Sequence, residues 1–227
     1  MRCALEIQGF IRYRTCVTCL TSLLVLTQEV LERARTALDV AVCQQIEHDV
    51  YRTFPEHLIF KTPVGRSALV NVITAYAYFS LAQVGYQQGI SFLAAVSLTQ
   101  LPEEMSFWFL VHLMKHEKLS SLYLNESTEG ALLHECQTKL LELIQQFLPD
   151  LHNHLLSLDL DIGLVTQQWF RTLFAYNLPL AVVYRFWDLF LLEGMDVMIW
   201  VAFTIFYLCK GESLFDALSQ SCAAVIC

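Results

Sequence analysis

A short polar segment, residues 46–55, holds the first side chains that could do chemistry. Ile46, Asp49 and Arg52 follow one another at intervals of three, so they wind gradually round one side of an expected helix. Ile46 is expected to anchor in the core, with Asp49 and Arg52 nearer its edge. Arg52 falls in the last turn before Pro55 ends the helix, where a long cationic side chain suits the helix dipole and can project outward. Taken alone, the pattern favours an ordinary surface ion pair between Asp49 and Arg52.

A second segment, residues 85–93, interrupts an apolar stretch with a tyrosine and two glutamines between two glycines. In order these are Gly85, Tyr86, Gln87, Gln88 and Gly89. Glycine permits unusual dihedral angles or close backbone approach, and the amides fall where a helix should break or begin. A polar interruption of a core helix is costly unless its groups find a partner. The alternative is a simple turn between two helices with satisfied glutamine side chains.

Two pairs of potential metal ligands lack the companions that a metal site needs. Cys16 and Cys19 have the spacing of half a zinc site, but no second pair follows, and the redox alternative needs a βαβ context. His112 and His116 lie four residues apart, yet Leu113 stands where a zinc-protease HExxH motif has glutamate. We therefore expect no metal. The 8 cysteines are expected to be reduced and mostly buried.

Motifs for binding nucleotides or for nucleophilic catalysis are missing from the sequence. It contains no glycine-rich phosphate cradle and no G-x-S-x-G elbow, so we expect no cofactor. The net charge of -8, without any block of Lys and Arg, argues against a nucleic-acid partner. The N-terminus lacks the basic, apolar and small-residue succession of a signal peptide.

Helices must position the polar segments, because the apolar spacing is helical almost throughout. An amphipathic segment is expected from Leu23 towards Val42, and a helix from Val42 to Arg52. Further helices are expected at 67–83, 88–98, from 102 onward, 132–147, 166–176 and 181–192, with loops at 61–65, 125–130 and around His152 and His154. Strand-like alternation and internal repeats are absent. The sequence therefore predicts an all-α fold in one compact domain.

The apolar composition also admits a membrane protein. Hydrophobic residues make up 56% of the chain, and no charged residue lies between Arg66 and Glu103. A spanning helix needs about 20 predominantly apolar residues. This stretch carries Asn71 and several glutamines, and burying each unpaired amide in lipid costs on the order of a few kcal/mol. A second apolar run, residues 197–209, is too short to cross. A buried helical core is favoured, with a polytopic membrane protein as the minor alternative.

Taken together, the two polar segments resemble the TBC-domain family of Rab GTPase-activating proteins. The family motifs I-x-x-D-x-x-R and Y-x-Q-G match, in order, Ile46, Asp49, Arg52, Tyr86, Gln88 and Gly89. Residues 53–55, 169–180 and 185–194 also look like the family, and the blocks keep its order and separation. The resemblance covers about residues 38–210 and implies a compact multi-helix TBC domain.

The resemblance implies a GTPase activator, not an enzyme with substrate turnover of its own. Rab-type GTPases hydrolyse GTP slowly, because transition-state charge is poorly stabilised and the attacking water is poorly held. By resemblance Arg52 is an arginine finger supplied in trans, an effect worth about 10³–10⁵ in rate. Gln88 would be a glutamine finger that positions the water. Asp49 would orient Arg52 or contact the partner, and Tyr86 and Gly89 would shape the glutamine loop. The implied partner is a GTP-bound Rab with its Mg²⁺, in vesicle trafficking.

Both ends of the chain depart from the family pattern. The R-x-x-x-W motif that usually precedes the arginine is absent, and residues 211–227 replace several expected C-terminal helices. We therefore expect a divergent N-terminal segment (1–37), a TBC domain (38–210) and a short divergent tail (211–227), truncated or divergent at both ends. The expectation of reduced cysteines favours a cytoplasmic location, and peripheral association with endomembranes stays open. A non-catalytic Rab-binding adaptor of the same fold is the alternative function.

Overall fold

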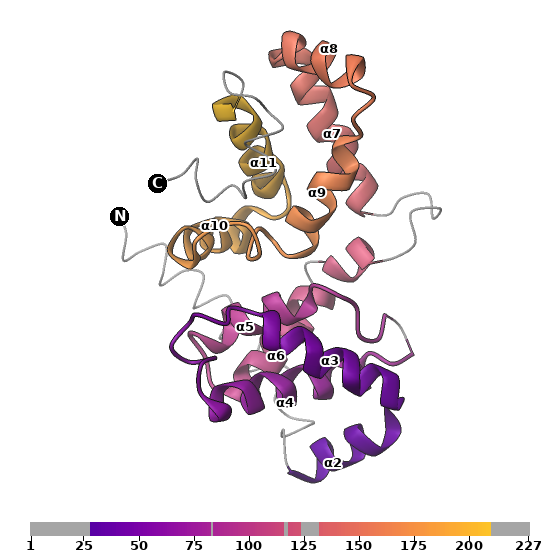
Figure 1. Cartoon of the computed structure of the whole chain (residues 1–227), viewed down its shortest axis with the longest axis vertical. Coiled ribbons are helices and arrows are strands. Elements are labelled where there is room, and N and C mark those ends of the chain that lie inside the picture. The colour runs from indigo at the N-terminus through magenta and orange to yellow at the C-terminus, as the bar shows by residue number, and fades with distance from the viewer. Residues whose placement is uncertain (1–27, 83, 116–117, 124–131, 210–227) are drawn as a thin grey trace. The chain divides into compact units, whose positions relative to one another are not determined.

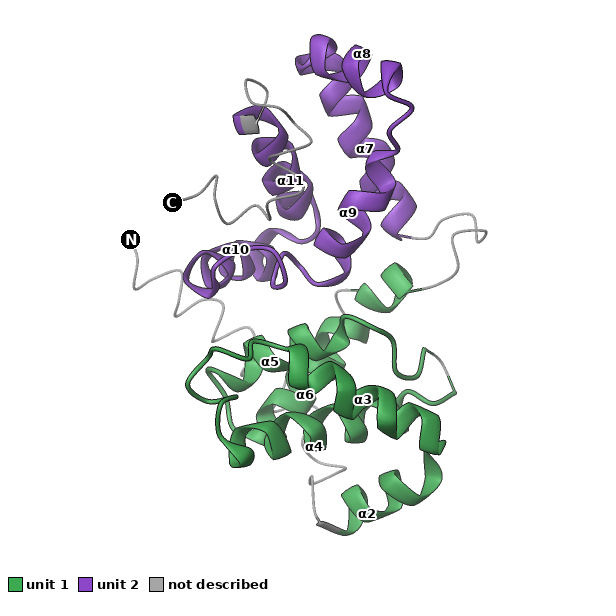
Figure 2. Cartoon of the chain, in the orientation of Figure 1, with its two compact units in different colours: residues 1–123 green, residues 124–227 purple. Residues whose placement is uncertain are grey.

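The structure is a computed structural model that describes residues 28–82, 84–115, 118–123 and 132–209 (Figure 1). Within these ranges the regular secondary structure is helical and no strand occurs, which confirms the predicted all-α fold. The chain divides into two compact units, residues 1–123 and 124–227 (Figure 2). Every site residue predicted from the sequence belongs to the first unit.

The first unit is built round α4. Its elements are α2 (Gln28–Ala37), α3 (Val40–Arg52), α4 (Pro63–Phe79), α5 (Ile90–Leu98), α6 (Glu103–Lys115) and the 3-10 helix η1 (Leu119–Tyr123). α4 contacts α2, α3, α5 and α6. Because neighbours cover it on several sides, α4 buries apolar residues round much of its surface, among them Leu69, Val72, Ile73 and Tyr76. This position explains the absence of charged side chains through most of the helix.

A break separates α2 from α3 at residues 38–39, slightly before Val42, where the sequence predicted that the amphipathic segment ends and the next helix begins. α2 ends at Ala37, and the Asp39 carboxylate accepts a 2.9 Å hydrogen bond from the backbone N–H of Ala41. This N-cap satisfies a donor that the first helical turn leaves unpaired. The second helix therefore starts at Val40, slightly earlier than predicted, and its predicted end at Arg52 is confirmed. The expected helical residues before 28 lie outside the described residues.

α4 begins and ends earlier than predicted. Pro63 stands at its first position, and Thr62 Oγ1 accepts a 3.0 Å hydrogen bond from the N–H of Gly65. Proline is favourable there because its missing N–H is not needed and its φ already suits a helix. Residues 63–65, expected as part of a loop, therefore form the first turn of the helix.

The end of α4 at Phe79 is set by Ser80 and Gly85. The Ser80 hydroxyl donates to the Tyr76 carbonyl at 2.8 Å, and the Gly85 N–H donates to the Ser80 carbonyl at 3.0 Å. Gly85 has a φ of 64°, a left-handed conformation that glycine adopts without penalty. The chain thus leaves the helix and turns towards α5, which begins next to Gly89 as predicted.

The apolar stretches that suggested a membrane protein form separate helices. The charge-free stretch divides between α4, with 17 residues, and α5, with 9 residues. Nearly all of α5 is buried, Ser91 and Ser97 included. Among the residues that the structure describes, no helix combines the length and the apolarity that a membrane crossing requires.

The second unit consists of five helices within the described residues. These are α7 (Leu132–Phe147), α8 (Pro149–Ser157), α9 (Ile162–Arg171), α10 (Leu180–Glu193) and α11 (Asp196–Cys209). α7 packs against α8, α9 and α11, and α10 packs against α11. The predicted helix at 132–147 is confirmed, and the one at 181–192 is confirmed to within one residue at each end.

Two predictions in the second unit were wrong. The segment with His152 and His154, expected as a loop, is α8, which begins at Pro149 and buries Leu151 and Leu155 one turn apart. The polar residues between these leucines, His152 and His154 among them, led to the prediction of a loop.

The helix predicted at 166–176 is α9, which starts and ends earlier. It starts at Ile162, because the Asp161 carboxylate accepts the Gly163 N–H at 2.7 Å. It ends at Arg171, because Leu173 has a φ of 45°. The indole N–H of Trp187 donates to the Leu173 carbonyl at 3.0 Å, which fixes this turn within the core.

Candidate functional site

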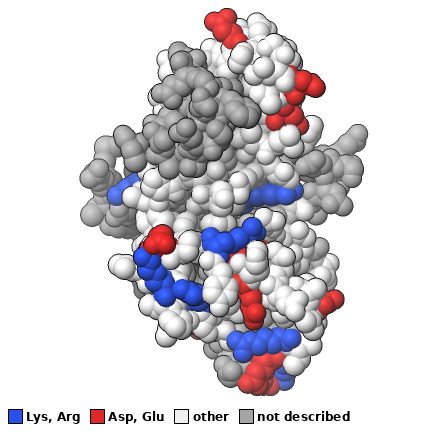
Figure 3. Space-filling view, viewed as in Figure 1, with Lys and Arg blue, Asp and Glu red and all other residues white. Residues whose placement is uncertain are grey.

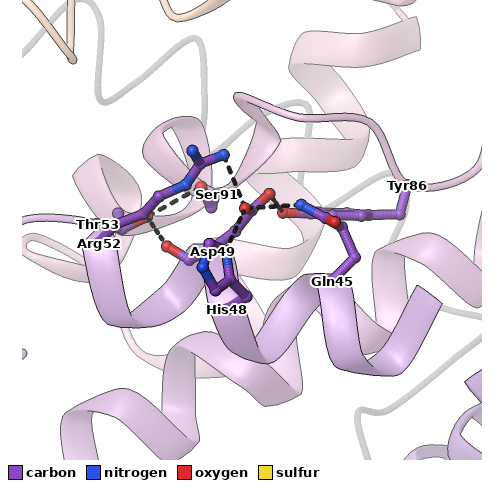
Figure 4. A network of polar contacts seen from close by, with 7 residues as sticks. All are labelled: Gln45, His48, Asp49, Arg52, Thr53, Tyr86 and Ser91. Atoms are coloured by element: carbon purple, nitrogen blue, oxygen red, sulfur yellow. Dashed lines mark hydrogen bonds and ion pairs between the residues drawn. The ribbon is translucent and has the colours of Figure 1, made fainter. Parts of the chain in front are cut away.

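Arg52 ends α3 and is held by Asp49, one helical turn earlier. The guanidinium Nη2 donates to Asp49 Oδ1 at 2.7 Å (Figure 4). The Asp49 side chain is 0% exposed, whereas the Arg52 side chain is 42% exposed. Side chains three residues apart on a helix are neighbours, so the helix itself creates the pair. One buried member distinguishes this ion pair from an ordinary surface pair.

The buried Asp49 carboxylate collects donors from two segments of the chain. The Tyr86 hydroxyl donates to Oδ2 at 2.5 Å, and Gln45 Nε2 donates to Oδ1 at 2.9 Å. His48 Nδ1 lies 3.9 Å from Oδ1. A charge removed from water is tolerated when it is paired and hydrogen-bonded, and Asp49 meets that condition. Its fixed carboxylate therefore gives the Arg52 guanidinium a defined direction.

Tyr86 is a permanent donor to this carboxylate. Burial raises the pKa of Tyr86 far above its usual value, and the hydrogen bond to Asp49 and the Asp49 charge raise it further. Ser91 and Arg52 act in the opposite direction but are outweighed. The phenol therefore stays protonated at physiological pH. Tyr86 thus ties the second polar segment to the first, 37 residues apart in the chain.

A second polar contact joins the same two segments. Thr53, the C-cap of α3, is buried, and its Oγ1 lies 2.7 Å from the Asp49 backbone oxygen and 3.0 Å from Ser91 Oγ. Ser91 is buried in the first turn of α5. Figure 4 shows these side chains converging between α3 and the start of α5.

Gln88 lies on the turn that leads into α5. Gly89 caps that helix with a φ of 103° and a ψ of -25°, a conformation that a residue with a side chain adopts only under strain. The Ile90 N–H donates to the Gln87 carbonyl at 3.3 Å and closes the turn. The Gln88 side chain is exposed and has no hydrogen-bond partner among the described residues. It can therefore contact a partner without breaking an internal bond.

The turn after Arg52 is packed in an unusual conformation. Phe54 has a φ of 45°, which is an outlier for a bulky residue. Its ring lies edge-on to Phe92 at 5.4 Å and stacked with Phe60 at 6.4 Å between centroids. These contacts stabilise the sharp turn, so α3 ends where Arg52 reaches the surface.

The loop that follows this turn is fixed to α4 by Arg66. The Arg66 guanidinium carbon lies 5.4 Å from the centroid of the Tyr51 ring, and its Nε donates to the Phe60 carbonyl at 2.7 Å. Lys61 pairs with Glu56 at 2.8 Å in the same loop. On the face drawn in Figure 3, basic and acidic side chains of the described residues lie beside one another. This loop thus carries charges of both signs and is anchored to α4.

The structure brings three of the six predicted site residues, Arg52, Asp49 and Tyr86, into direct contact. Gln88 and Gly89 form the adjoining turn, and Ile46 is fully buried as an anchor of α3. Sequence reasoning gave no role to Gln45, Thr53 or Ser91, which complete the network. Their signals were present but weak: Gln45 precedes Asp49 by four residues, and the two hydroxyls flank the matched motifs.

The other candidate ligands do not assemble in the part of the chain that the structure describes. No group of three or more His, Cys, Asp and Glu that could hold a metal ion occurs there. Cys16, Cys19 and His116 lie outside the described residues. Cys43 is half-buried and Cys136 buried, both with free thiols. Burial raises the pKa of Cys136 to about 12, so this thiol is unreactive.

Fold and site together define an all-α domain that presents an arginine, braced by a buried carboxylate, at the end of a helix. A sequence model of the Rab-GTPase-TBC domain matches residues 28–214. The chain belongs to the Rab-GTPase-TBC domain family.

Curated relatives agree with this assignment. The chain is 38% identical over 170 residues to the Rab GTPase-activating protein eat-17 of Caenorhabditis elegans, covering 74% of this chain and 19% of that protein. It is 36% identical over 190 residues to the human TBC1 domain family member 2A, covering 82% of this chain and 20% of the relative. The chain thus spans about a fifth of the length of these relatives.

Solved structures show the same fold. The Chlamydomonas flagellar RabGAP TBC domain superposes with a TM-score of 0.76 at 23% identity, covering 97% of this chain and 76% of that one. The Ypt/Rab-GAP domain of Gyp1p superposes with a TM-score of 0.63 at 19% identity, covering 85% and 66%.

Proposed function

We propose that the chain stimulates GTP hydrolysis by a small GTPase of the Rab family, with Arg52 and Gln88 supplied in trans. The family match and the relatives named Rab GTPase-activating proteins support the choice of partner. The observation that carries the proposal is the 2.7 Å pair between Arg52 and the buried Asp49, at a helix end where the arginine remains 42% exposed.

An arginine in this position suits phosphoryl transfer. The γ-phosphoryl group passes through a transition state with charge spread over its oxygens, and catalysis there is mainly positioning and electrostatic stabilisation. The Arg52 guanidinium would donate N–H groups to these oxygens and to the leaving oxygen. Because Asp49 already restricts its direction, less conformational entropy is lost when it engages.

Gln88 would hold the attacking water. Its amide oxygen can accept a hydrogen bond from the water while its NH₂ group donates to the phosphoryl oxygens or to the partner's backbone. The exposed side chain and the Gly89 cap support this role. The partner would bring GTP and Mg²⁺, so the chain would need no cofactor of its own.

The supporting residues would act through these two. Asp49 would orient Arg52, Tyr86 would hold Asp49, Gly89 would shape the glutamine turn, and Ile46 would anchor α3. The boundaries of the functional part, residues 38 and 210, stay a prediction. The proposal further makes the protein cytoplasmic, with peripheral association with endomembranes as a corollary that cell fractionation tests.

The test is a panel of purified, GTP-loaded Rab proteins with phosphate release as the readout. Arg52→Ala should remove about 10³-fold or more of the stimulation. Arg33→Ala is its matched control, because Arg33 is also exposed and paired on a helix, with Glu29 at 2.6 Å. Gln88→Ala should likewise lower the rate, whereas Gln87→Ala, at the exposed neighbouring position, should not.

Three outcomes separate the hypotheses. Acceleration that depends on Arg52 and Gln88 supports the proposal. Rab binding with hydrolysis left at the intrinsic rate would indicate the adaptor alternative instead. If the chain accelerates no Rab and binds none, both functions are rejected.

A further inference from the structure

Two buried hydroxyls, those of Thr53 and Ser91, join the segment that carries Arg52 to the segment that carries Gln88 (Figure 4). Thr53 directly follows Arg52, and Ser91 stands three residues after Gln88. We infer that this hydroxyl pair is a positioning device that fixes the spacing between the two segments. The inference rests on the proposed function and adds two positioning residues to it.

The hydroxyl pair stands beside a second polar contact between the same two segments. Thr53 Oγ1 lies 2.7 Å from the Asp49 backbone oxygen and 3.0 Å from Ser91 Oγ. The Tyr86 hydroxyl donates to the Asp49 carboxylate at 2.5 Å. Two contacts therefore join the segments, one between Thr53 and Ser91 and one between Asp49 and Tyr86.

A pair of buried hydroxyls specifies position more than it adds stability. Folding exchanges hydrogen bonds to water for internal ones, so the net stabilisation per bond is small, and apolar side chains of the same shape would be nearly neutral. A hydroxyl differs from a methyl group because its hydrogen bond forms only within a narrow range of distances and angles. Thr53 and Ser91 thus determine where the end of α3 lies relative to the start of α5.

Buried hydroxyls also occur in purely local roles, and Ser97 provides the comparison. Ser97 lies on the same helix as Ser91 and is buried to a similar degree. Its hydroxyl donates to the Ala94 carbonyl at 2.7 Å, within its own helix. Ser97→Ala therefore removes a buried hydroxyl of α5 without touching the contact between the segments.

The first test measures kcat and KM of the stimulated GTPase reaction for four single variants and one double variant of the whole chain. Thr53→Val and Ser91→Ala should each lower kcat about tenfold with little change in KM, because a displacement of about 1 Å can cost up to about 100-fold in rate. Thr53→Ser, which retains the hydroxyl, and Ser97→Ala should keep the wild-type kcat. The double variant Thr53→Val/Ser91→Ala should be no slower than the slower single variant. Wild-type kcat in both Thr53→Val and Ser91→Ala would overturn the inference.

The second test needs no GTPase activity. Amide hydrogen exchange is followed across residues 86–92 in the whole chain, with folding checked by circular dichroism. Thr53→Val changes only the end of α3, yet it should speed exchange on the Gln88 turn, whereas Thr53→Ser and Ser97→Ala should not. If Thr53→Val fails to fold, amide exchange is measured in Ser91→Ala instead. That variant changes only α5, yet it should speed exchange at residues 50–54, at the end of α3.

The two tests distinguish a failure of the positioning inference from a failure of the proposed function. Unchanged exchange in Thr53→Val overturns the positioning role even where Arg52→Ala abolishes stimulation. A chain that stimulates no Rab but shows the altered exchange keeps the hydroxyl coupling and loses the proposed function.

Discussion

The Tyr86 hydroxyl bonds to one oxygen of the Asp49 carboxylate at 2.5 Å, while Arg52 bonds to the other at 2.7 Å. The buried carboxylate therefore divides its oxygens between two chain segments. Gln45 adds a further donor at 2.9 Å. If Arg52 left Asp49 to engage a partner as proposed, Tyr86 and Gln45 would still donate to the carboxylate, so the buried charge would not be left without a donor.

Removing the carboxylate charge should impair stimulation without unfolding the protein. Asp49→Asn keeps the shape but replaces the bond between two opposite charges with a weaker bond from the Arg52 guanidinium to a neutral amide oxygen, so kcat should fall about tenfold. Asp49→Ala should also destabilise the fold by about 1–3 kcal/mol, because Tyr86 is left unpaired. Stimulated phosphate release and chemical denaturation measure the two effects.

The control for Asp49 is Glu29→Gln in the exposed pair with Arg33, which should change stability by less than about 1 kcal/mol. Asp49→Asn with wild-type kcat would show that the carboxylate has no part in orienting Arg52.

The positions of the helices could largely be predicted from apolar spacing, because most helices bury a face or a whole surface. The first and last residues of several helices could not be predicted in this way, because they depend on single hydrogen bonds such as that from the Ala41 N–H to Asp39. At the site, the spacing of Asp49 and Arg52 predicted their ion pair. The contact between Asp49 and Tyr86 could not be predicted from local pattern, because it joins residues 37 apart through tertiary packing.

Tyr86 should make stability depend on alkaline pH. Its folded-state pKa is raised above the usual 10.0, so its contribution is fully present below about pH 10 and is lost as the pH rises further. Wild type should therefore lose free energy of unfolding above pH 10 more steeply than Tyr86→Phe, although Tyr76, whose pKa is also raised, contributes in both. Denaturation midpoints across that range decide the matter. Parallel curves for the two proteins would contradict the buried donor role.

Gly89 and Gly85 should differ in what they tolerate. Gly89 has a φ of 103°, beyond the left-handed helical region, whereas Gly85 has a φ of 64° and open space where a Cβ would stand. Asparagine visits the left-handed region readily, so Gly85→Asn should cost less than about 1 kcal/mol. Gly89→Asn should cost about 1–3 kcal/mol and lower stimulation further by redirecting Gln88. Equal costs at the two sites in chemical denaturation would refute this account of the turn.

The central claim is that Arg52 acts on the partner's transition state. Single-turnover hydrolysis by a GTP-loaded Rab, with the chain at saturating concentration, measures this directly because binding is held constant. Arg33→Ala should match wild type, while Arg52→Ala should lose about 10³-fold or more of the acceleration. An Arg52→Ala chain that accelerates hydrolysis as well as wild type would contradict the claim.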